Sequence, residues 1–108
     1  MPRRARLNAA DIYAMLQRVP AGMVTTYGDI ASAVGNPDAS RAVGRILNKN
    51  PNPVIVPCHR VVRSDGTIGG YAFGKRSKMR LLVREGMRFT GDCLNDFARY
   101  RIPVRQLR

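Results

Sequence analysis

Four stretches of the chain repeat apolar residues at the spacing of an amphipathic helix. The first begins after Asn8, a favourable N-cap, and continues to about Arg18, where Pro-Ala-Gly at 20–22 ends the pattern. Its apolar positions are Ile12, Met15, Leu16 and Val19. We therefore predict a first helix that places one face in the core.

A pair of short helices is predicted next. Thr26 and Asp29 have the spacing of a capping box, which predicts a second helix that Gly35 ends. After a turn, a third helix is expected over residues 39 to about 49, with Asp38 as its N-cap. This basic helix leaves three polar residues on its outer face: Ser40, Arg41 and Arg45. Two short helices joined by a tight turn are typical of a helix-turn-helix.

An extended segment follows the third helix. Asn-Pro-Asn-Pro at 50–53 cannot continue a helix, and the apolar run after it ends at about residue 62. Residues 60–63 and 67–68 are predicted to pair as a hairpin across the turn Ser-Asp-Gly. This hairpin would form a small wing beside the helices.

The last part of the chain begins with a glycine-rich loop that carries two aromatic residues. A fourth helix is predicted from Lys75 to Glu85, with Met79, Leu82 and Val83 facing inward. A further short helix is expected at about 94–99. The whole pattern predicts a mainly α fold with a small β-hairpin wing, like a winged helix-turn-helix.

Length and composition are those of one folded domain. The chain has 108 residues, and 44% of them are hydrophobic, which suffices for a modest core. No apolar run approaches the length of a membrane span, and no secretory signal pattern opens the sequence. We expect one domain over residues 1–108, a monomer without a membrane partner that works inside the cell, in the cytoplasm or, in a eukaryote, the nucleus.

Charge changes this picture most. The chain carries 19 Lys and Arg against 7 Asp and Glu, a formal net charge of +12. Such an excess favours polyanions as partners, and a generally basic surface of no specific use is the alternative. The basic residues are spread over the N-terminus, the third and fourth helices and the tail. This distribution indicates a folded surface that contacts phosphates at several points.

The candidate chemistry lies in the extended segment, Val-Ile-Val-Pro-Cys-His-Arg-Val-Val at 54–62. It sets Cys58 beside His59, the one histidine of the sequence. A cysteine reacts as its thiolate and needs a base or a positive neighbour to become a good nucleophile. Taken alone, the pair also fits a core cysteine beside a loop histidine. With one histidine, and with Cys93 far from Cys58 in the sequence, we expect neither a metal site nor another cofactor.

Several motifs extend this signal, in a fixed order along the chain. They are Thr-Tyr-Gly-Asp-Ile-Ala at 26–31, Ser-Arg-Ala-Val-Gly at 40–44, Asn-Pro at 50–51, Pro-Cys-His-Arg-Val at 57–61, Gly-Tyr at 70–71 and the segment from Leu-Leu to Glu-Gly at 81–86. Together they resemble the pattern of the O6-alkylguanine-DNA alkyltransferases, also called methylated-DNA-protein-cysteine methyltransferases. The resemblance covers roughly Pro20 to Gly86.

The resemblance implies a DNA repair protein that takes an alkyl group from O6 of guanine, or less readily from O4 of thymine, onto its own cysteine, once per molecule. Cys58 matches the acceptor, His59 the base that acts through a water, and Glu85 the residue that orients this histidine. Tyr71 matches a tyrosine that donates to the departing base. Asn50 matches an asparagine that braces the turn before the active site.

The resemblance also implies double-stranded DNA as the partner, with the alkylated guanine turned out of the stack. Arg41 matches the arginine that replaces the lost base, and Tyr27 matches the tyrosine that presses on the flanking phosphate. Ser40 and Arg45 are expected to contact DNA from the same helix. Lys78 matches a lysine near the leaving side, and we count it with the DNA-binding residues. An ordinary packing or solvated role is the alternative for each.

Other functions stay open. Full-length members of the family carry an additional N-terminal domain, which we expect to be absent here because seven residues precede the first predicted helix. Alkyltransferase-like proteins are short relatives that bind alkylated guanine without repairing it. Their acceptor cysteine is typically replaced, often by tryptophan, whereas this chain has Cys58 and no tryptophan. A winged-helix regulator with a structural or redox-sensing cysteine and a cysteine hydrolase are the weaker alternatives.

Overall fold

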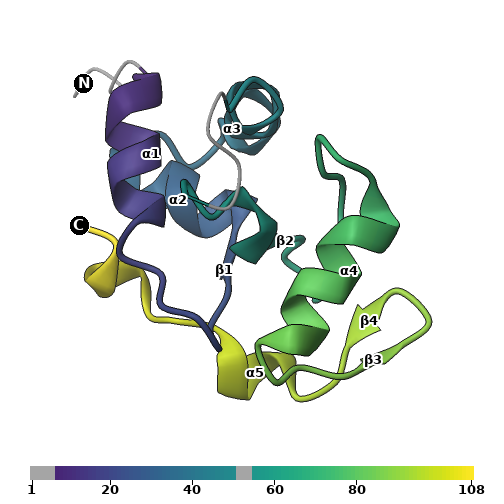
Figure 1. Ribbon diagram of the computed structural model, residues 1–108. Helices are drawn as coiled ribbons and strands as arrows, with labels where there is room; N and C mark the ends of the chain where they lie inside the picture. Colours follow the sequence, from purple (N-terminus) through teal and green to yellow (C-terminus); the bar gives the residue numbers. More distant parts are fainter. Residues whose placement is uncertain (1–6, 51–54) are drawn as a thin grey trace.

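The structure, a computed structural model, describes residues 7–50 and 55–108. Its order of elements is shown in Figure 1: α1 (Ala9–Leu16), β1 (Thr25–Thr26), α2 (Tyr27–Val34), α3 (Ser40–Leu47), the 3₁₀-helix η1 (Cys58–Arg60), β2 (Val61–Val62), α4 (Lys75–Arg84), β3 (Phe89–Thr90), β4 (Cys93–Leu94), α5 (Phe97–Tyr100) and the 3₁₀-helix η2 (Val104–Gln106). Helices dominate, as the sequence predicts. None of the helices in these two ranges is long and apolar enough to cross a membrane.

The first two helices begin at the predicted caps. The Asn8 side chain accepts a hydrogen bond from the Ala10 N–H at 2.8 Å, and the Thr26 hydroxyl accepts one from the Asp29 N–H at 3.0 Å. Gly35 ends α2 in the left-handed region, with φ of 95°. Each bond satisfies a helix-end donor that has no partner inside the helix.

Two local predictions were wrong. Ala39, not Asp38, is the N-cap of α3, and no side chain caps that helix. Val83 on α4 is 38% exposed, because the buried face of this helix passes through Lys78 and Leu82 instead. The hydrophobic periodicity alone could not predict that the inner face of α4 carries a lysine.

The strand pairing also differs in detail from the predicted wing. The turn at 64–66 forms, with the Arg63 N–H donating to the Thr67 carbonyl at 2.9 Å. However, β2 pairs in parallel with β1, in the register Thr25 with Val61. Thr67 pairs instead with Cys93, which belongs to the antiparallel hairpin β3–β4. The small antiparallel hairpin therefore lies near the end of the chain.

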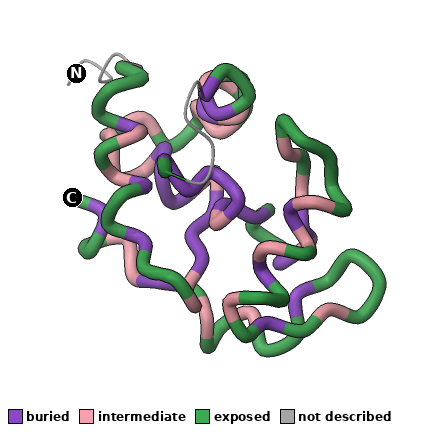
Figure 2. The backbone as a smooth tube through the Cα atoms, viewed as in Figure 1, coloured by how far each residue is buried: buried purple, intermediate pink, exposed green. Residues whose placement is uncertain are grey.

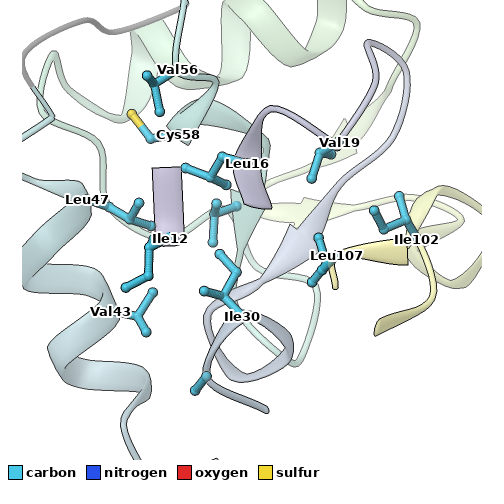
Figure 3. Packing of buried hydrophobic residues seen from close by; sticks show 12 residues of the cluster. Ile12, Leu16, Val19, Ile30, Val43, Leu47, Val56, Cys58, Ile102 and Leu107 are labelled. Atoms are coloured by element: carbon cyan, nitrogen blue, oxygen red, sulfur yellow. The ribbon is translucent and has the colours of Figure 1, made fainter. Parts of the chain in front are cut away.

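Most of the buried hydrophobic residues belong to two clusters; Figure 2 colours the buried positions purple, and Figure 3 shows the first cluster. The first joins α1, α2 and α3 to residues 56–61 and the tail: Ile12, Leu16, Val19, Ile30, Ala31, Val43, Leu47, Val56, Cys58, Val61, Ile102 and Leu107. The second lies between β1, β2, α4 and the hairpin: Val24, Val62, Leu82, Met87 and Leu94. Burying each large aliphatic side chain contributes roughly 1.5–3 kcal/mol.

The tail is an integral part of the fold. Its backbone runs beside β1, where the Val24 N–H donates to Tyr100 and the Ile102 N–H donates back to Val24. The Arg101 guanidinium also grips the Asp29 carboxylate with two bonds of 2.8 Å. Asp29 therefore connects α2 to the tail and does not return to the cap, so only half of the predicted capping box forms.

Candidate active site

Cys58 lies at the point where the chain turns from an extended segment into η1. Pro57 takes φ −80° and ψ 63°, and the Cys58 N–H donates to the Val56 carbonyl at 2.7 Å, which together define an inverse γ-turn. The cysteine is 5% exposed and belongs to the first core cluster (Figure 3). A tight turn and a packed core thus hold the sulfur in one place.

Asn50 fastens this turn from the end of the helix-turn-helix. Its buried side-chain amide donates to the Val56 carbonyl at 2.9 Å and to the Cys58 sulfur at 3.3 Å. The asparagine lies just beyond α3, so it couples that helix to the cysteine.

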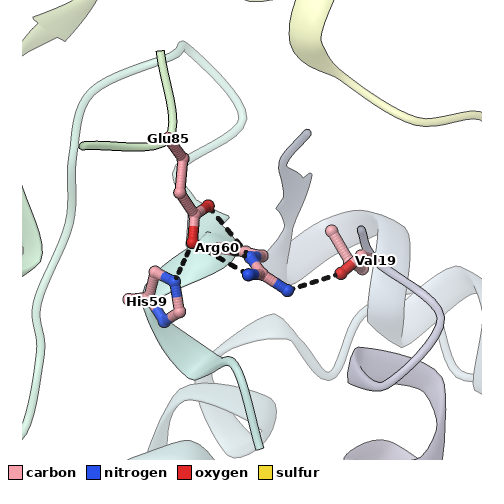
Figure 4. Close-up of polar contacts among 4 residues, drawn as sticks. All are labelled: Val19, His59, Arg60 and Glu85. Carbon is pink, nitrogen blue, oxygen red and sulfur yellow. Dashed lines mark hydrogen bonds and ion pairs between the residues drawn. The ribbon is translucent and has the colours of Figure 1, made fainter. Parts of the chain in front are cut away.

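His59, Glu85 and Arg60 form one network (Figure 4). Glu85 Oε2 lies 2.9 Å from His59 Nε2 and 2.8 Å from Arg60 Nη2. The Arg60 Nε also donates to Glu85 Oε1 at 3.0 Å, and its Nη1 donates to the Val19 carbonyl at 2.9 Å. The Arg60 guanidinium therefore holds the Glu85 carboxylate through hydrogen bonds from two of its nitrogens. This pair links the end of α4 to η1.

This network sets the protonation state of His59. Burial lowers the pKa of His59 below its usual value, and the hydrogen bond and charge of Glu85 offset this only in part. Burial would raise the pKa of Glu85, but the bonds from Arg60 and His59 hold it below its usual value. At neutral pH a neutral histidine therefore donates through Nε2–H to a carboxylate, which leaves Nδ1 as a proton acceptor. This Nδ1 is buried and has no hydrogen-bond partner within residues 7–50 and 55–108.

Lys78 and Tyr27 meet at one carbonyl of the glycine-rich loop. The Lys78 Nζ donates to the Gly70 carbonyl at 2.9 Å, and the Tyr27 hydroxyl lies 3.4 Å from the same oxygen. The Lys78 Nζ also lies 5.8 Å from the centre of the Tyr27 ring. Lys78 is fully buried, unlike the exposed arginines of α3, so here it holds the loop and presents no atom at the surface.

Tyr71 presents a second polar atom without a partner. Its hydroxyl is buried and has no hydrogen-bond partner among the described residues, while its ring meets Phe73 edge to face at 5.8 Å. Burial raises the pKa of Tyr71, so the phenol keeps its proton at neutral pH. The side chain packs against the cluster that contains Cys58. A proton donor is thus available on the same loop that Lys78 holds.

The outer face of α3 borders a pocket of about 270 Å³. Its lining includes three of the five residues predicted to bind DNA, together with Arg63 and Gly70: Tyr27, Ser40, Arg41, Gly44, Asn48, Arg63 and Gly70. Arg45 is exposed on α3 outside this lining. The structure therefore brings Tyr27, Ser40 and Arg41 together at this pocket, while Lys78 lies buried behind it, against Tyr27 and Gly70.

Two residues of the site were not among those predicted from the sequence. Arg60 binds Glu85, and Arg63 lines the pocket beside Arg41. Arg60 follows the Cys-His pair directly, and a buried carboxylate in a chain of this charge needs a cation. That adjacency was the signal that could have identified Arg60.

The buried lysine makes stability depend on pH. Burial lowers the pKa of Lys78 from 10.5 to about 7, so between about pH 7 and 10.5 the unfolded chain binds more protons than the folded one. Raising the pH through this window therefore stabilises the fold, by up to about 2 kcal/mol between pH 7 and 9. We expect denaturant unfolding at several pH values to show this rise in the wild type and a smaller one in Lys78→Met. The exposed lysine of the same helix supplies the control, Lys75→Met, which should keep the wild-type slope; a slope that Lys78→Met leaves unchanged would contradict the prediction.

The sequence is similar to proteins that act on alkylated DNA. A family profile described as "6-O-methylguanine DNA methyltransferase, DNA binding domain" matches residues 8–87. The methylated-DNA–protein-cysteine methyltransferase of Methanosarcina acetivorans is 49% identical over 76 residues, covering 70% of this chain and 49% of that protein. The bifunctional methyltransferase/endonuclease of Thermoplasma volcanium is 40% identical over 106 residues, covering 90% of this chain and 33% of that protein. The chain thus spans between about a third and about half of the length of these curated relatives.

Solved structures show the same fold. Atl1 of S. pombe, in complex with damaged DNA containing O6-carboxymethylguanine, superposes with a TM-score of 0.75 at 29% identity and covers 88% of this chain and 94% of that chain. OGT of Mycobacterium tuberculosis, in complex with DNA, has a TM-score of 0.71 at 39% identity and covers 76% of this chain and 50% of that chain. The mainly helical fold predicted from the sequence is confirmed by both.

Proposed function

Because the chain belongs to the 6-O-methylguanine DNA methyltransferase family, we propose that it repairs O6-alkylguanine in duplex DNA by moving the alkyl group to Cys58. The observation that carries this proposal is the geometry around the cysteine. A turn held by Asn50 fixes Cys58, and the next residue, His59, is oriented by Glu85 and keeps a buried acceptor nitrogen. These are the parts of an activated nucleophile.

The reaction follows from these groups. The Cys58 thiol gives its proton, through a water, to Nδ1 of His59, and Glu85 stabilises the resulting imidazolium. The thiolate attacks the alkyl carbon, a carbon–sulfur bond forms, and the carbon–O6 bond breaks. The departing guanine anion takes up a proton from the Tyr71 hydroxyl on the glycine-rich loop, and solvent carries the proton held by His59 back to the phenolate, so that the thiol proton ends on guanine. The product thioether is stable, so each molecule acts once.

The helix-turn-helix supplies the substrate in a reactive position. O6 of a stacked base cannot reach a buried thiol, so the lesion must be turned out of the duplex, at a cost of a few kcal/mol. We assign Arg41 to the space that the flipped base leaves in the DNA stack. Tyr27, Ser40 and Arg45 are assigned to the DNA backbone around that space. Charge-assisted contacts of a +12 chain with phosphates offset the cost of unstacking. Lys78 acts from inside, by holding Gly70.

Mass spectrometry tests the proposal directly. The protein is incubated with a duplex that carries one O6-methylguanine, and an undamaged duplex is the control. We expect one methyl group on the peptide that contains Cys58, with stoichiometry that stops at one per protein. Methylation elsewhere, or no mass change with either duplex and no selective binding, would refute the proposal.

A second function is supported by one observation. Atl1, whose structure is a complex with damaged DNA containing O6-carboxymethylguanine, superposes on this chain with a TM-score of 0.75. The alternative is therefore a protein that binds O6-alkylguanine without transfer and marks it for another repair pathway. The intact arrangement of Cys58, His59 and Glu85 favours transfer. Tight, lesion-selective binding without a mass change would establish the alternative.

Arg41 separates base flipping from chemistry. We expect Arg41→Ala to slow repair of a lesion in duplex DNA by about 10–100-fold, because the space left by the flipped base is no longer filled. Transfer from the free alkylguanine base needs no flipping and should change by less than about twofold. Single-turnover rates on the two substrates measure the difference, and Arg105→Ala, which removes the same charge from η2, is the control. Equal losses on both substrates would contradict this role.

A further inference from the structure

The loop of residues 69–74 is tied at both ends to a single residue outside the segment that matches the family. The carbonyl of Asp92 accepts a hydrogen bond from the Ile68 N–H at 2.9 Å, just before the loop. The carboxylate of the same residue accepts one from Lys75 Nζ at 2.6 Å, just after the loop. The family match ends at residue 87, so this contact is a property of the tail.

The turn of the C-terminal hairpin places Asp92 between these two ends. The strands β3 and β4 are joined by the two residues Gly91 and Asp92, and Gly91 has φ of 58°, in the left-handed region that favours glycine. The hairpin is itself anchored, because the Leu94 N–H donates to the Gly66 carbonyl at 2.9 Å and the Leu94 side chain lies in the second core cluster. The position of Asp92 is therefore set by the core.

The loop needs such anchors. Three of its six residues are glycines, whose backbone has the most conformational freedom to lose on ordering. Its middle is held at the Gly70 carbonyl by Lys78, and Phe73 at its tip is 59% exposed. Between these points lies Tyr71, whose buried hydroxyl has no partner among the described residues. Where Tyr71 stands thus depends on how firmly both ends of the loop are held.

We propose that Asp92 is a positioning residue for the alkyl-acceptor site: through the β3–β4 hairpin it holds the two ends of loop 69–74 together and so sets the place of Tyr71 against the core cluster that contains Cys58. The inference rests on the proposed function. It adds to that function a contribution from Asp92 in the tail, whose hydrogen bonds are with Ile68 and Lys75. The pair of Asp92 and Lys75 is half-exposed, 53% on each side, so its contribution lies in the order of the loop more than in global stability.

The test combines charge exchange with a change of the turn. We expect Asp92→Lys to lower the limiting rate of single-turnover transfer from a lesion duplex by about tenfold, as a displaced group near the reacting atoms does. The double variant Asp92→Lys with Lys75→Asp restores the opposite charges and should return to within about twofold of the wild type. The DNA concentration at half-saturation should change less than the transfer rate does, because Tyr27, Ser40 and Arg41 are untouched. Amide exchange of residues 68–75 should rise in the single variant and fall again in the double variant.

The turn provides a matched pair. A Cβ at Gly91 would meet no atom within 4 Å, so only its φ matters there. Gly91→Val should displace Asp92 and slow transfer, whereas Gly91→Asn, which tolerates the left-handed region, should not. Asp96→Asn is the control for loss of a neighbouring exposed acid.

Two results would overturn the inference. The first is that both Asp92→Lys and Gly91→Val keep the transfer rate and the amide exchange of residues 68–75 within twofold of the wild type. The other is a lost rate that the charge exchange fails to restore, because that would indicate a general structural role. If the wild type transfers no alkyl group, the proposed function fails, and the exchange of residues 68–75 still decides whether Asp92 holds the loop.

Discussion

Cys58→Ala is expected to lower alkyl transfer by more than about a thousandfold, to the level of the uncatalysed reaction, and to leave lesion binding intact. The loss is complete because the sulfur is the atom that accepts the alkyl group. The fold should survive, since Asn50 keeps its bond to the Val56 carbonyl and alanine fits the inverse γ-turn. The change removes one buried sulfur, and we expect a cost of about 1–2 kcal/mol in the free energy of unfolding.

The measurement is transfer of a labelled methyl group from duplex DNA to protein, together with binding of the same duplex. Cys93→Ala is the matched control, because Cys93 is the other free cysteine of the described residues and is exposed on β4. It should transfer at the wild-type rate. Transfer that survives in Cys58→Ala and is lost in Cys93→Ala would show that the acceptor has been misassigned.

Glu85→Gln is expected to have the second largest effect, on both rate and stability. The carboxylate is 14% exposed and receives bonds from His59 and from Arg60, which is 17% exposed. Without its charge, the imidazolium that forms during thiol deprotonation loses its counter-ion, and we expect transfer to slow by about 10²–10³-fold. Arg60 keeps its bond to the Val19 carbonyl but is left partly buried without a counter-ion, which should cost about 2–4 kcal/mol in the free energy of unfolding.

Two measurements separate these effects. Denaturant unfolding gives the stability, and single-turnover transfer at a temperature where both proteins are folded gives the rate. Asp65→Asn, which removes an exposed carboxylate in the turn after β2, should change transfer by less than about twofold. A Glu85→Gln protein that is destabilised but transfers at the wild-type rate would show that Glu85 braces the fold without assisting His59.

Short-range signals in the sequence determined much of this protein. Asn8, Thr26 and Gly35 bound the first two helices where the sequence places them, because a cap is a bond between residues two to five positions apart. The adjacency of Cys58 and His59 likewise needs no fold to be seen. The family resemblance over roughly residues 20–86 then identified Glu85, Tyr71 and Asn50 as candidates.

Only the tertiary structure decided which distant groups meet. The parallel pairing of β1 with β2, the grip of Arg101 on Asp29, and the meeting of Arg60 with Glu85 join residues that local patterns treat as independent. The burial of Lys78 is a fact of the same kind, since its place on α4 reads as surface until Tyr27 and Gly70 are packed against it. Helical periodicity and caps depend on contacts between residues within one helical turn of each other. Strand register, ion pairs and burial instead depend on closing loops of tens of residues. The sequence therefore shows the reactive cysteine and its candidate helpers, and the fold decides which of them are close enough to act.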